Sequence, residues 1–157
     1  MLPDAERVGA LVAELAMTIA TAESLTGGAV AEALVEVPGS GDWLAGGVVA
    51  YHSRVKHDLL GVKGHRVVSA TAVREMAQGA AALLNTDVGI ATTGCAGPAS
   101  MDGQPVGTVW VGISIPGGTI AEHHFIEGDP EQIRRGAVQC ALAAAASLLE
   151  RGKRTGP

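Results

Sequence analysis

Three residues in the first half of the chain carry side chains that hydrolytic chemistry needs. Ser24 stands in the stretch TAESLTGG, where an apolar strand-like run ends, and Tyr51 and Lys56 follow in AYHSRVK. A serine hydroxyl is a weak nucleophile unless a neighbouring base removes its proton, and that base is a histidine or an uncharged lysine. His52 and Lys56 are therefore the candidate bases for Ser24.

The stretch around Ser24 also has a purely structural interpretation. Ser24 or Thr26 can cap the helix that follows while Gly27 and Gly28 let the backbone turn, and the pattern alone slightly favours this cap. The glycines equally suit an anion site, because a helix N-terminus presents free N–H groups and the positive end of its dipole. No Gly-Lys-Ser/Thr follows, which excludes a nucleoside triphosphate loop.

The other candidates have weaker support. By frequency a lysine such as Lys56 is more often solvated, and a tyrosine such as Tyr51 is more often a partly buried ring. Cys95, in TTGCAGP, is interpreted as a small buried filler. Arg134 or Arg135 is kept as a tether for a carboxylate or phosphate, because a cation near a helix N-terminus opposes the dipole. No cluster has metal-ligand spacing, so we expect neither metal nor cofactor.

Helical and strand-like patterns alternate along the chain. Ser53, Ser69 and Asp129 are expected to cap helices, and Pro130 suits a first helical position. The spacing of apolar residues predicts helices over residues 4–16, 26–37, 53–60, 69–84 and 130–150, and strands over 17–22, 43–51, 87–93, 106–115 and 119–126.

This alternation predicts an α/β fold, a three-layer α/β/α sandwich. The last two strands are joined by a short PGG turn, so they form an antiparallel hairpin and the sheet is mixed. Residues 1–150 are expected to form one domain. Residues 151–157, where basic residues alternate with glycine, are expected to form a flexible tail.

Composition narrows the classes of partner. The net charge is -5 and the pI near 5.4, so the chain lacks the basic footprint of a nucleic-acid or anionic-lipid binder. No apolar run approaches the roughly 18 residues of a spanning helix, and the N-terminus has no basic start typical of a secretion signal. We expect a cytoplasmic protein with a small-molecule partner and with Cys95 and Cys140 reduced.

Six stretches, in this order, carry a resemblance to a known family. They are AESLTGG (22–28), VPGSGDWLAGGVVAYHSRVKHDLLGV (37–62), VVSATAVREMAQGA (67–80), TTGCAGP (92–98), PVGTVWVGI (105–113) and GDPEQIRRGAV (128–138). Together they resemble the C-terminal domain family of CinA, the nicotinamide-nucleotide amidohydrolases. The ordered set covers nearly the whole chain and is far more specific than any one motif.

The resemblance implies deamidation of nicotinamide mononucleotide to nicotinate mononucleotide, with release of ammonia, by a serine/lysine hydrolase without metal. The family serine falls on Ser24, the lysine on Lys56 and the motif tyrosine on Tyr51, which removes His52 as the base. Tyr51 would orient Lys56 or pass on its proton. The residues expected to contact the substrate nucleotide are Thr26, Gly27, Gly28, Thr93, Gly94, Gly97 and Arg135.

Such a mechanism makes two physical demands. An uncharged Lys56 requires burial or nearby positive charge to lower its pKa well below the ~10.4 of a free lysine. Backbone N–H groups near Gly27, Gly28 or Gly94 would stabilise the oxyanion.

The chain also departs from the family pattern, which leaves other functions open. Leu25 replaces a frequent cysteine, and the loop after Pro98 is shorter than the usual glycine-rich version. A module that binds a nucleotide without turnover, and a domain that regulates a partner protein, are the alternatives. The family's domain occurs alone or fused behind a larger one; this chain resembles the stand-alone form, and family habit predicts a homo-oligomer.

Overall fold

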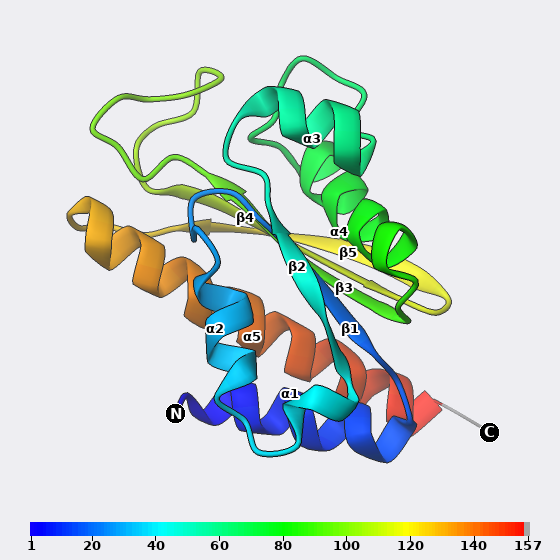
Figure 1. Cartoon of the computed structure of the whole chain (residues 1–157). Coiled ribbons are helices and arrows are strands. Elements are labelled where there is room, and N and C mark those ends of the chain that lie inside the picture. The colour runs from blue at the N-terminus through cyan, green and yellow to red at the C-terminus, as the bar shows by residue number, and fades with distance from the viewer. Residues whose placement is uncertain (156–157) are drawn as a thin grey trace.

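A mixed five-stranded sheet with helices on both faces forms the fold (Figure 1). The computed structural model describes residues 1–155. The elements are α1 (Pro3–Leu15), β1 (Ile19–Glu23), α2 (Ala29–Val35), the 3₁₀ turn η1 (Ser40–Asp42), β2 (Leu44–Val49), α3 (Ser53–Leu60), α4 (Ala70–Leu84), β3 (Val88–Gly94), β4 (Thr108–Ile115), β5 (Gly118–Phe125) and α5 (Pro130–Thr155).

The strands lie in the order β2-β1-β3-β4-β5. β1 pairs in parallel with β2 and β3, whereas β3–β4 and β4–β5 are antiparallel. The predicted hairpin and the mixed sheet are therefore confirmed. Because β1, β2 and β3 run in the same direction, their carboxyl ends meet at one edge of the sheet, the edge at which open α/β folds bind ligands.

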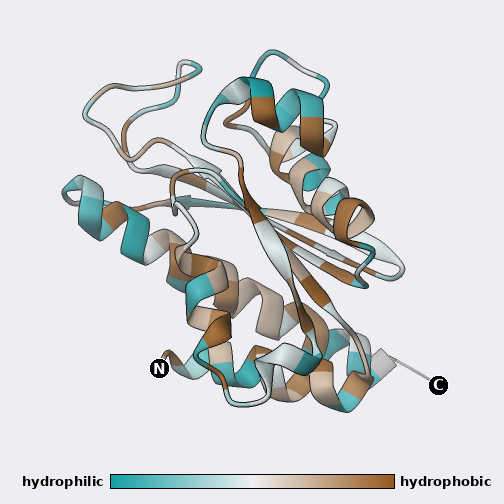
Figure 2. Ribbon diagram, viewed as in Figure 1, coloured by the Kyte–Doolittle hydropathy of each residue, from teal (hydrophilic) through white to brown (hydrophobic). Residues whose placement is uncertain are grey.

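Two hydrophobic cores, one on each face, hold the layers together (Figure 2). On one face α1, α2 and α5 bury Val8, Leu34 and Leu142 against the sheet. On the other, α4 packs Val73 and Met76 onto it, and α3 packs on α4. The three-layer α/β/α arrangement is as predicted, and thin Ala and Val side chains fill most of both cores.

Side-chain caps fix where the longer helices begin. Ser69 Oγ accepts from the N–H of Ala72 at 3.0 Å, as predicted. Asp129 Oδ1 accepts from the N–H of Gln132 at 2.8 Å, and Gln132 Oε1 accepts from the N–H of Asp129 at 2.9 Å. This reciprocal pair is a capping box that sets the start of α5.

The cap of α3 differs from the prediction. His52, not Ser53, precedes the helix, and its Nδ1 accepts from the N–H of Arg54 at 3.0 Å. An imidazole nitrogen can take this role as a hydroxyl does, so the helix begins at Ser53, one residue earlier than a cap at Ser53 would set it.

The predicted flexible tail is also corrected, because α5 continues to Thr155. Lys153 Nζ forms an ion pair with Glu14 Oε1 of α1 at 2.6 Å, which ties this end of α5 to the neighbouring helix. Residues 151–155 are thus helical, and residues 156–157 of the expected tail lie outside the described residues.

Candidate active site

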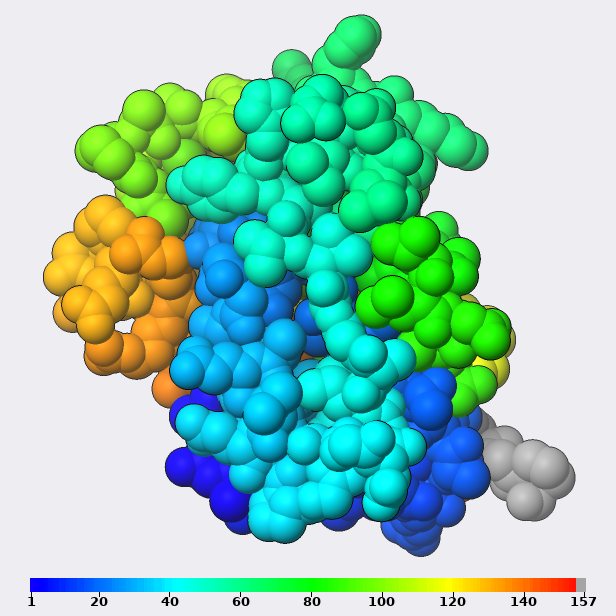
Figure 3. Space-filling model, viewed as in Figure 1, coloured from blue at the N-terminus to red at the C-terminus, as the bar shows by residue number. Residues whose placement is uncertain are grey.

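The carboxyl edge of the parallel strands gathers most of the candidate residues. Ser24 directly follows β1, Tyr51 lies just after β2, and Gly94 ends β3. Because β4 is antiparallel to β3, the loop of residues 95–107 that joins them returns to the same edge. In Figure 3 the atoms of this 95–107 loop (lime) lie beside α3 (teal) and above the start of α5 (orange).

Ser24 lines a small cavity at this edge. The cavity has a volume of about 150 Å³, and Ser24 itself is 7% exposed. The N–H of Ser24 donates to the carbonyl of Thr92 at 3.2 Å, which fixes its backbone to β3. Lining residues are Ser24, Leu25, Tyr51, Gly94, Cys95, Ala96, Gly97, Ala99, Met101 and Arg134.

The helix-cap interpretation of Ser24 is not supported, because another residue caps α2. Glu23, 1% exposed, accepts from the N–H groups of Val30 at 2.8 Å and Ala31 at 3.0 Å. Its Oε1 also accepts from Thr26 Oγ1 at 2.6 Å. A carboxylate at a helix N-terminus is favoured by the helix dipole. Within residues 1–155, the hydroxyl of Ser24 has no recorded hydrogen bond and remains available for chemistry.

The same contacts remove α2 as an anion site. The N–H groups of Ala29 and Glu32 donate to the carbonyls of Thr26 and Gly28, and Glu23 takes the two between them. A phosphate would therefore find the start of α2 already occupied by a carboxylate.

Lys56 is buried in the first turn of α3 and is only 2% exposed. Its Nζ donates to the carbonyl oxygen of Tyr51 at 3.1 Å. Burial lowers the pKa of Lys56 to about 8, against the opposing effect of the Asp102 carboxylate, which raises it. A burial-induced shift of this kind makes the neutral amine accessible near neutral pH, which a general base requires.

Tyr51 connects Lys56 to the Ser24 cavity. Its carbonyl holds the Lys56 amine, whereas its side chain, 72% exposed, lies at the mouth of the cavity. No hydrogen bond between Ser24 Oγ and Lys56 Nζ is recorded in the described chain. The two predicted reacting groups thus reach the same edge of the sheet through Tyr51, without direct contact.

The predicted substrate-contact residues divide into two sets. Gly94 and Gly97 line the Ser24 cavity. Thr93 does not, because its hydroxyl donates to the carbonyl of Val67 at 2.6 Å. Thr26, Gly27, Gly28 and Arg135 are also absent from the cavity wall.

Arg134, and not Arg135, lines the Ser24 cavity, whereas both arginines line the larger pocket between α2 and α5. Arg135 pairs with Glu131 at 2.6 Å along the exposed face of α5, and Arg134 lines the Ser24 cavity. No ion pair of Arg134 is recorded among residues 1–155. The sequence singled out both arginines, but adjacent helix positions point about 100° apart, and only the orientation of α5 distinguishes them.

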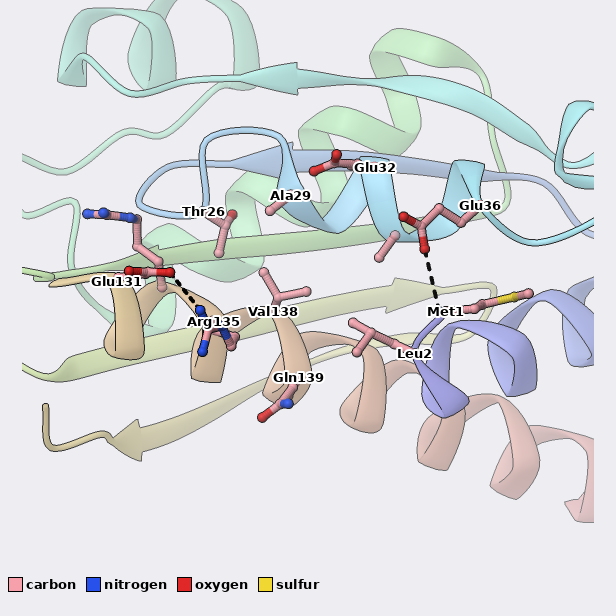
Figure 4. A pocket seen from close by; sticks show the side chains of 12 residues that line it. Met1, Leu2, Thr26, Ala29, Glu32, Glu36, Glu131, Arg135, Val138 and Gln139 are labelled. Atoms are coloured by element: carbon pink, nitrogen blue, oxygen red, sulfur yellow. Dashed lines mark hydrogen bonds and ion pairs between the residues drawn. The ribbon is translucent and has the colours of Figure 1, made fainter. Parts of the chain in front are cut away.

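A larger pocket of about 510 Å³ opens between α2 and α5 and shares Arg134 with the Ser24 cavity. Figure 4 shows Thr26 and Ala29 on the α2 side of this pocket facing Val138 on the α5 side, with the Arg135–Glu131 ion pair at one end and the Met1 amino group paired with Glu36 at the other. The Ser24 cavity and the α2–α5 pocket therefore adjoin each other at Arg134.

Leu25 and Asp102 are site residues that the sequence analysis did not identify. Leu25 follows Ser24, lines the cavity and has an N–H without a hydrogen-bond partner in the described chain; its position after Ser24 was the available signal. Asp102, in the 95–107 loop, carries the carboxylate that raises the pKa of Lys56. The Asp102-Gly103 dipeptide indicated a turn in the sequence, but not which part of the chain the carboxylate would contact.

No group of three or more His, Cys, Asp or Glu side chains among residues 1–155 is placed to hold a metal ion. Nor does any helix described here have the length and apolar character needed to cross a membrane.

Comparison with known proteins identifies the family. Residues 3–149 match the model of the CinA C-terminal domain. A competence-damage inducible protein of Desulforamulus reducens is 38% identical over 91% of this chain, and a CinA-like protein of Solibacter usitatus is 38% identical over 86%. These matches cover 36% and 34% of the relatives, so the chain spans about a third of their length.

Solved structures agree with this assignment. A CinA superfamily protein from Klebsiella pneumoniae superposes with a TM-score of 0.89 at 31% identity, covering 94% of this chain and 96% of that one. A competence/damage inducible protein from Agrobacterium tumefaciens gives 0.84 at 29% identity, covering 94% and 97%. With its fold, its ordered motifs and these relatives in agreement, the chain belongs to the CinA C-terminal domain family.

Proposed function

We propose that this domain is an amidohydrolase that converts nicotinamide mononucleotide and water to nicotinate mononucleotide and ammonia. One observation carries the proposal: the buried amine of Lys56, with its pKa lowered to about 8, is held by the carbonyl of Tyr51, a residue that also lines the Ser24 cavity. A dry, partly neutral lysine and an unbonded serine hydroxyl, brought to the same edge of the sheet, are the components of a serine/lysine hydrolase.

The reaction begins with a proton transfer. Ser24 Oγ attacks the carboxamide carbon while neutral Lys56 Nζ takes the hydroxyl proton. The tetrahedral intermediate collapses, the C–N bond breaks, and the Lys56 ammonium returns its proton to the departing ammonia. Water then attacks the acyl-serine with Lys56 again as the base, which releases the carboxylate and restores Ser24.

Tyr51 serves this mechanism mainly through its main chain. Its carbonyl accepts from Lys56 Nζ at 3.1 Å and orients the amine, whereas its exposed ring forms part of the entrance. For the reaction to begin, Lys56 Nζ must exchange the Tyr51 carbonyl for Ser24 Oγ as its partner.

The oxyanion requires N–H donors aimed into the cavity. The N–H of Gly27 already donates to the carbonyl of Ser24 at 3.1 Å and is engaged. The unpaired N–H of Leu25, the residue after the nucleophile, replaces it as the leading donor. Gly94, which also borders the cavity, remains a second candidate.

The dimensions of the site suit a ring with an extended tail. At about 150 Å³ the Ser24 cavity is smaller than the roughly 300 Å³ of common small-molecule pockets, so it accommodates the amide-bearing ring alone. Arg134 stands where this cavity adjoins the α2–α5 pocket and offers a guanidinium to the 5′-phosphate.

The test is direct. Purified protein is incubated with nicotinamide mononucleotide in the presence of EDTA, and ammonia and nicotinate mononucleotide are quantified. The wild type is expected to release both in equal amounts, and Ser24→Ala and Lys56→Ala to release neither while remaining folded. Binding of the nucleotide without product would replace the hydrolase by a binding module, and wild-type turnover in Lys56→Ala would refute the lysine's role.

A further inference from the structure

The outer strand β5 leaves one row of backbone groups without a partner. It is the last strand in the sheet and, within residues 1–155, pairs only with β4 (Figure 1). The register with β4 is continuous, and the N–H of Ile126, directly after β5, donates to the carbonyl of Gly107, directly before β4, at 2.9 Å. Alternate residues direct their N–H and C=O groups to opposite sides of a strand. Those of Ala121, His123 and Phe125 therefore point away from β4, to the open edge.

The two outer strands of the sheet differ in how their edges are protected. Bulges, short strands, proline and lysine are the usual means of preventing one sheet edge from pairing with another. In β2 the register with β1 shifts after Leu44, and two glycines, Gly46 and Gly47, weaken the strand further. β5 is eight residues long, keeps its register and contains no Lys, Arg or Pro. Phe125, at its end, is 56% exposed. Such an edge is suited to pairing with another strand.

The charges along β5 show which strand it is suited to bind. Glu122 Oε2 and His124 Nε2 lie 3.2 Å apart on one face, with side chains 39% and 33% exposed. If a second β5 pairs antiparallel with His123 opposite the partner's His123, each Glu122 lies opposite the partner's His124. Carboxylates and imidazoles then alternate, and an imidazole N–H can donate to a carboxylate whether or not the ring is protonated. An axis at Glu122 would instead place like charges opposite each other, which is unfavourable.

The apolar side chains of β5 match in the same register. Ile120 lies opposite the partner's Ile126 on the face that carries Glu122, and both isoleucines already pack against the edge of that core. On the other face the exposed ring of Phe125 lies over the partner's Ala121. Ala121, His123 and Phe125 are also the residues with outward backbone groups, so each opposed pair exchanges both of its N–H···O=C bonds.

We propose that β5 is a dimerisation edge: a second copy of this chain pairs with it antiparallel about a two-fold axis at His123 and joins the two sheets into one. Self-complementarity of this kind is what an isologous two-fold contact requires. No residue of β5 lines the Ser24 cavity, so this inference is independent of the proposed function.

The first measurement is the mass of the protein in solution. Sedimentation velocity of the wild type is expected to give twice the 15.8 kDa of the chain. His123→Pro removes an outward N–H without removing a bond to β4, and it is expected to give a monomer with unchanged circular dichroism. His123→Ala is the matched control, because it keeps the N–H and is expected to remain dimeric. A monomeric wild type, or a folded and dimeric His123→Pro, would overturn the proposal.

A charge exchange tests the register and does not depend on how well a proline variant folds. Glu122→His places imidazoles opposite one another, and His124→Glu places carboxylates opposite one another. Each is expected to raise the Kd of the dimer about tenfold, because the like-charge contact occurs twice across a two-fold axis. The double variant Glu122→His/His124→Glu restores the alternation and should recover the wild-type Kd.

His65→Glu is the control for the charge exchange, because it makes the same change at an exposed position outside β5. It is expected to leave the Kd of the dimer unchanged. An unchanged Kd in the single variants Glu122→His and His124→Glu, or no recovery in the double variant, would refute the opposition of Glu122 and His124.

A disulfide locates the axis directly. Opposed residues of a hydrogen-bonded antiparallel pair have Cα atoms about 5.5 Å apart, within the range of about 4.4–6.8 Å that a disulfide spans. His123→Cys is therefore expected to give a covalent dimer under mild oxidation, and the wild type, with Cys95 and Cys140, measures the background. Thr119→Cys, in the same strand, should remain unlinked because it lies away from the axis. A linked Thr119→Cys, or an unlinked His123→Cys, would contradict an axis at His123.

Discussion

The burial of Lys56 cannot be explained by the stability of the fold alone. Lysine is almost never fully buried without an ionised partner, yet this one is 2% exposed and hydrogen-bonds to a carbonyl. The site therefore costs stability whenever the amine is protonated. Such a cost is expected where function requires a reactive group, because stability and activity are frequently in opposition.

The stability lost by protonating the buried Lys56 amine predicts how the stability of Lys56→Met will differ from that of the wild type as the pH changes. The folded-state pKa of Lys56 is about 8 and its ordinary value 10.5, so between these pH values the unfolded chain binds more protons and wild-type stability falls as pH falls. Lys56→Met lacks this dependence. The variant should gain on the order of 2 kcal/mol relative to wild type from pH 10.5 to pH 7. Urea unfolding at several pH values measures it, and parallel curves would contradict the lowered pKa.

Arg134 and Arg135 offer a paired test of phosphate binding. Arg134 lines the Ser24 cavity, and Arg135 pairs with Glu131. Arg134→Ala should raise the KM for nicotinamide mononucleotide about tenfold, the value of one exposed charge-assisted contact, while Arg135→Ala changes it little. Steady-state kinetics with the mononucleotide and with its dephosphorylated riboside show whether Arg134 binds the phosphate. An equal rise in KM for both substrates in Arg134→Ala would exclude the phosphate as the partner of Arg134.

At the scale of elements, α2 depends on a residue outside it. The helix has seven residues and no side-chain cap at its own N-cap, Gly28. Glu23, from the end of β1, supplies the missing acceptors and joins strand to helix across Ser24. The conformation around Ser24 is thus set by a buried carboxylate.

Glu23→Gln tests this connection. The amide retains one acceptor oxygen but loses the charge that favours the helix N-terminus, so the free energy of unfolding should fall by about 1–3 kcal/mol. Glu32→Gln, an exposed change of the same kind in α2, should stay within about 0.5 kcal/mol of wild type. Denaturant unfolding provides both values. Equal stability of the two variants would show that α2 does not depend on Glu23.

The elements themselves were largely predictable, whereas contacts between distant segments were not. Apolar periodicity is a local signal, and it located the helices and strands and the caps at Ser69 and Asp129. Ser24 and Lys56 could be paired only through the family resemblance. The Asp102–Val67 contact joins loops 35 residues apart and depends on how those loops are folded, which no local pattern encodes.

At the scale of the molecule, backbone-to-backbone packing places the helical layer that carries Lys56. α4 lies against the sheet where Gly89 and Gly112 have no side chains, since a Cβ there would meet the carbonyl oxygens of Ala77 and Val73 at 2.0 and 2.4 Å. Gly79 of α4 allows α3 to pack equally closely on α4, because a Cβ at this position would lie 2.1 Å from the carbonyl oxygen of Leu60. The position of α3, and hence of Lys56, depends on the absence of a Cβ at Gly79.

Gly79→Ala should therefore damage the site as well as the fold. Alanine gains about 1 kcal/mol in helix propensity, but overpacking against backbone costs about 1–3 kcal/mol or more, so we expect net destabilisation. Because Leu60 ends α3, the helix that carries Lys56, the displacement should also lower kcat and shift the pH midpoint at which Lys56 titrates in an NMR experiment. Gly136→Ala in α5 is the control: its Cβ meets only the Ile126 side chain, which can rotate, and the propensity gain should prevail. A stabilised, fully active Gly79→Ala would mean that α3 is positioned by its side chains and not by this close backbone contact.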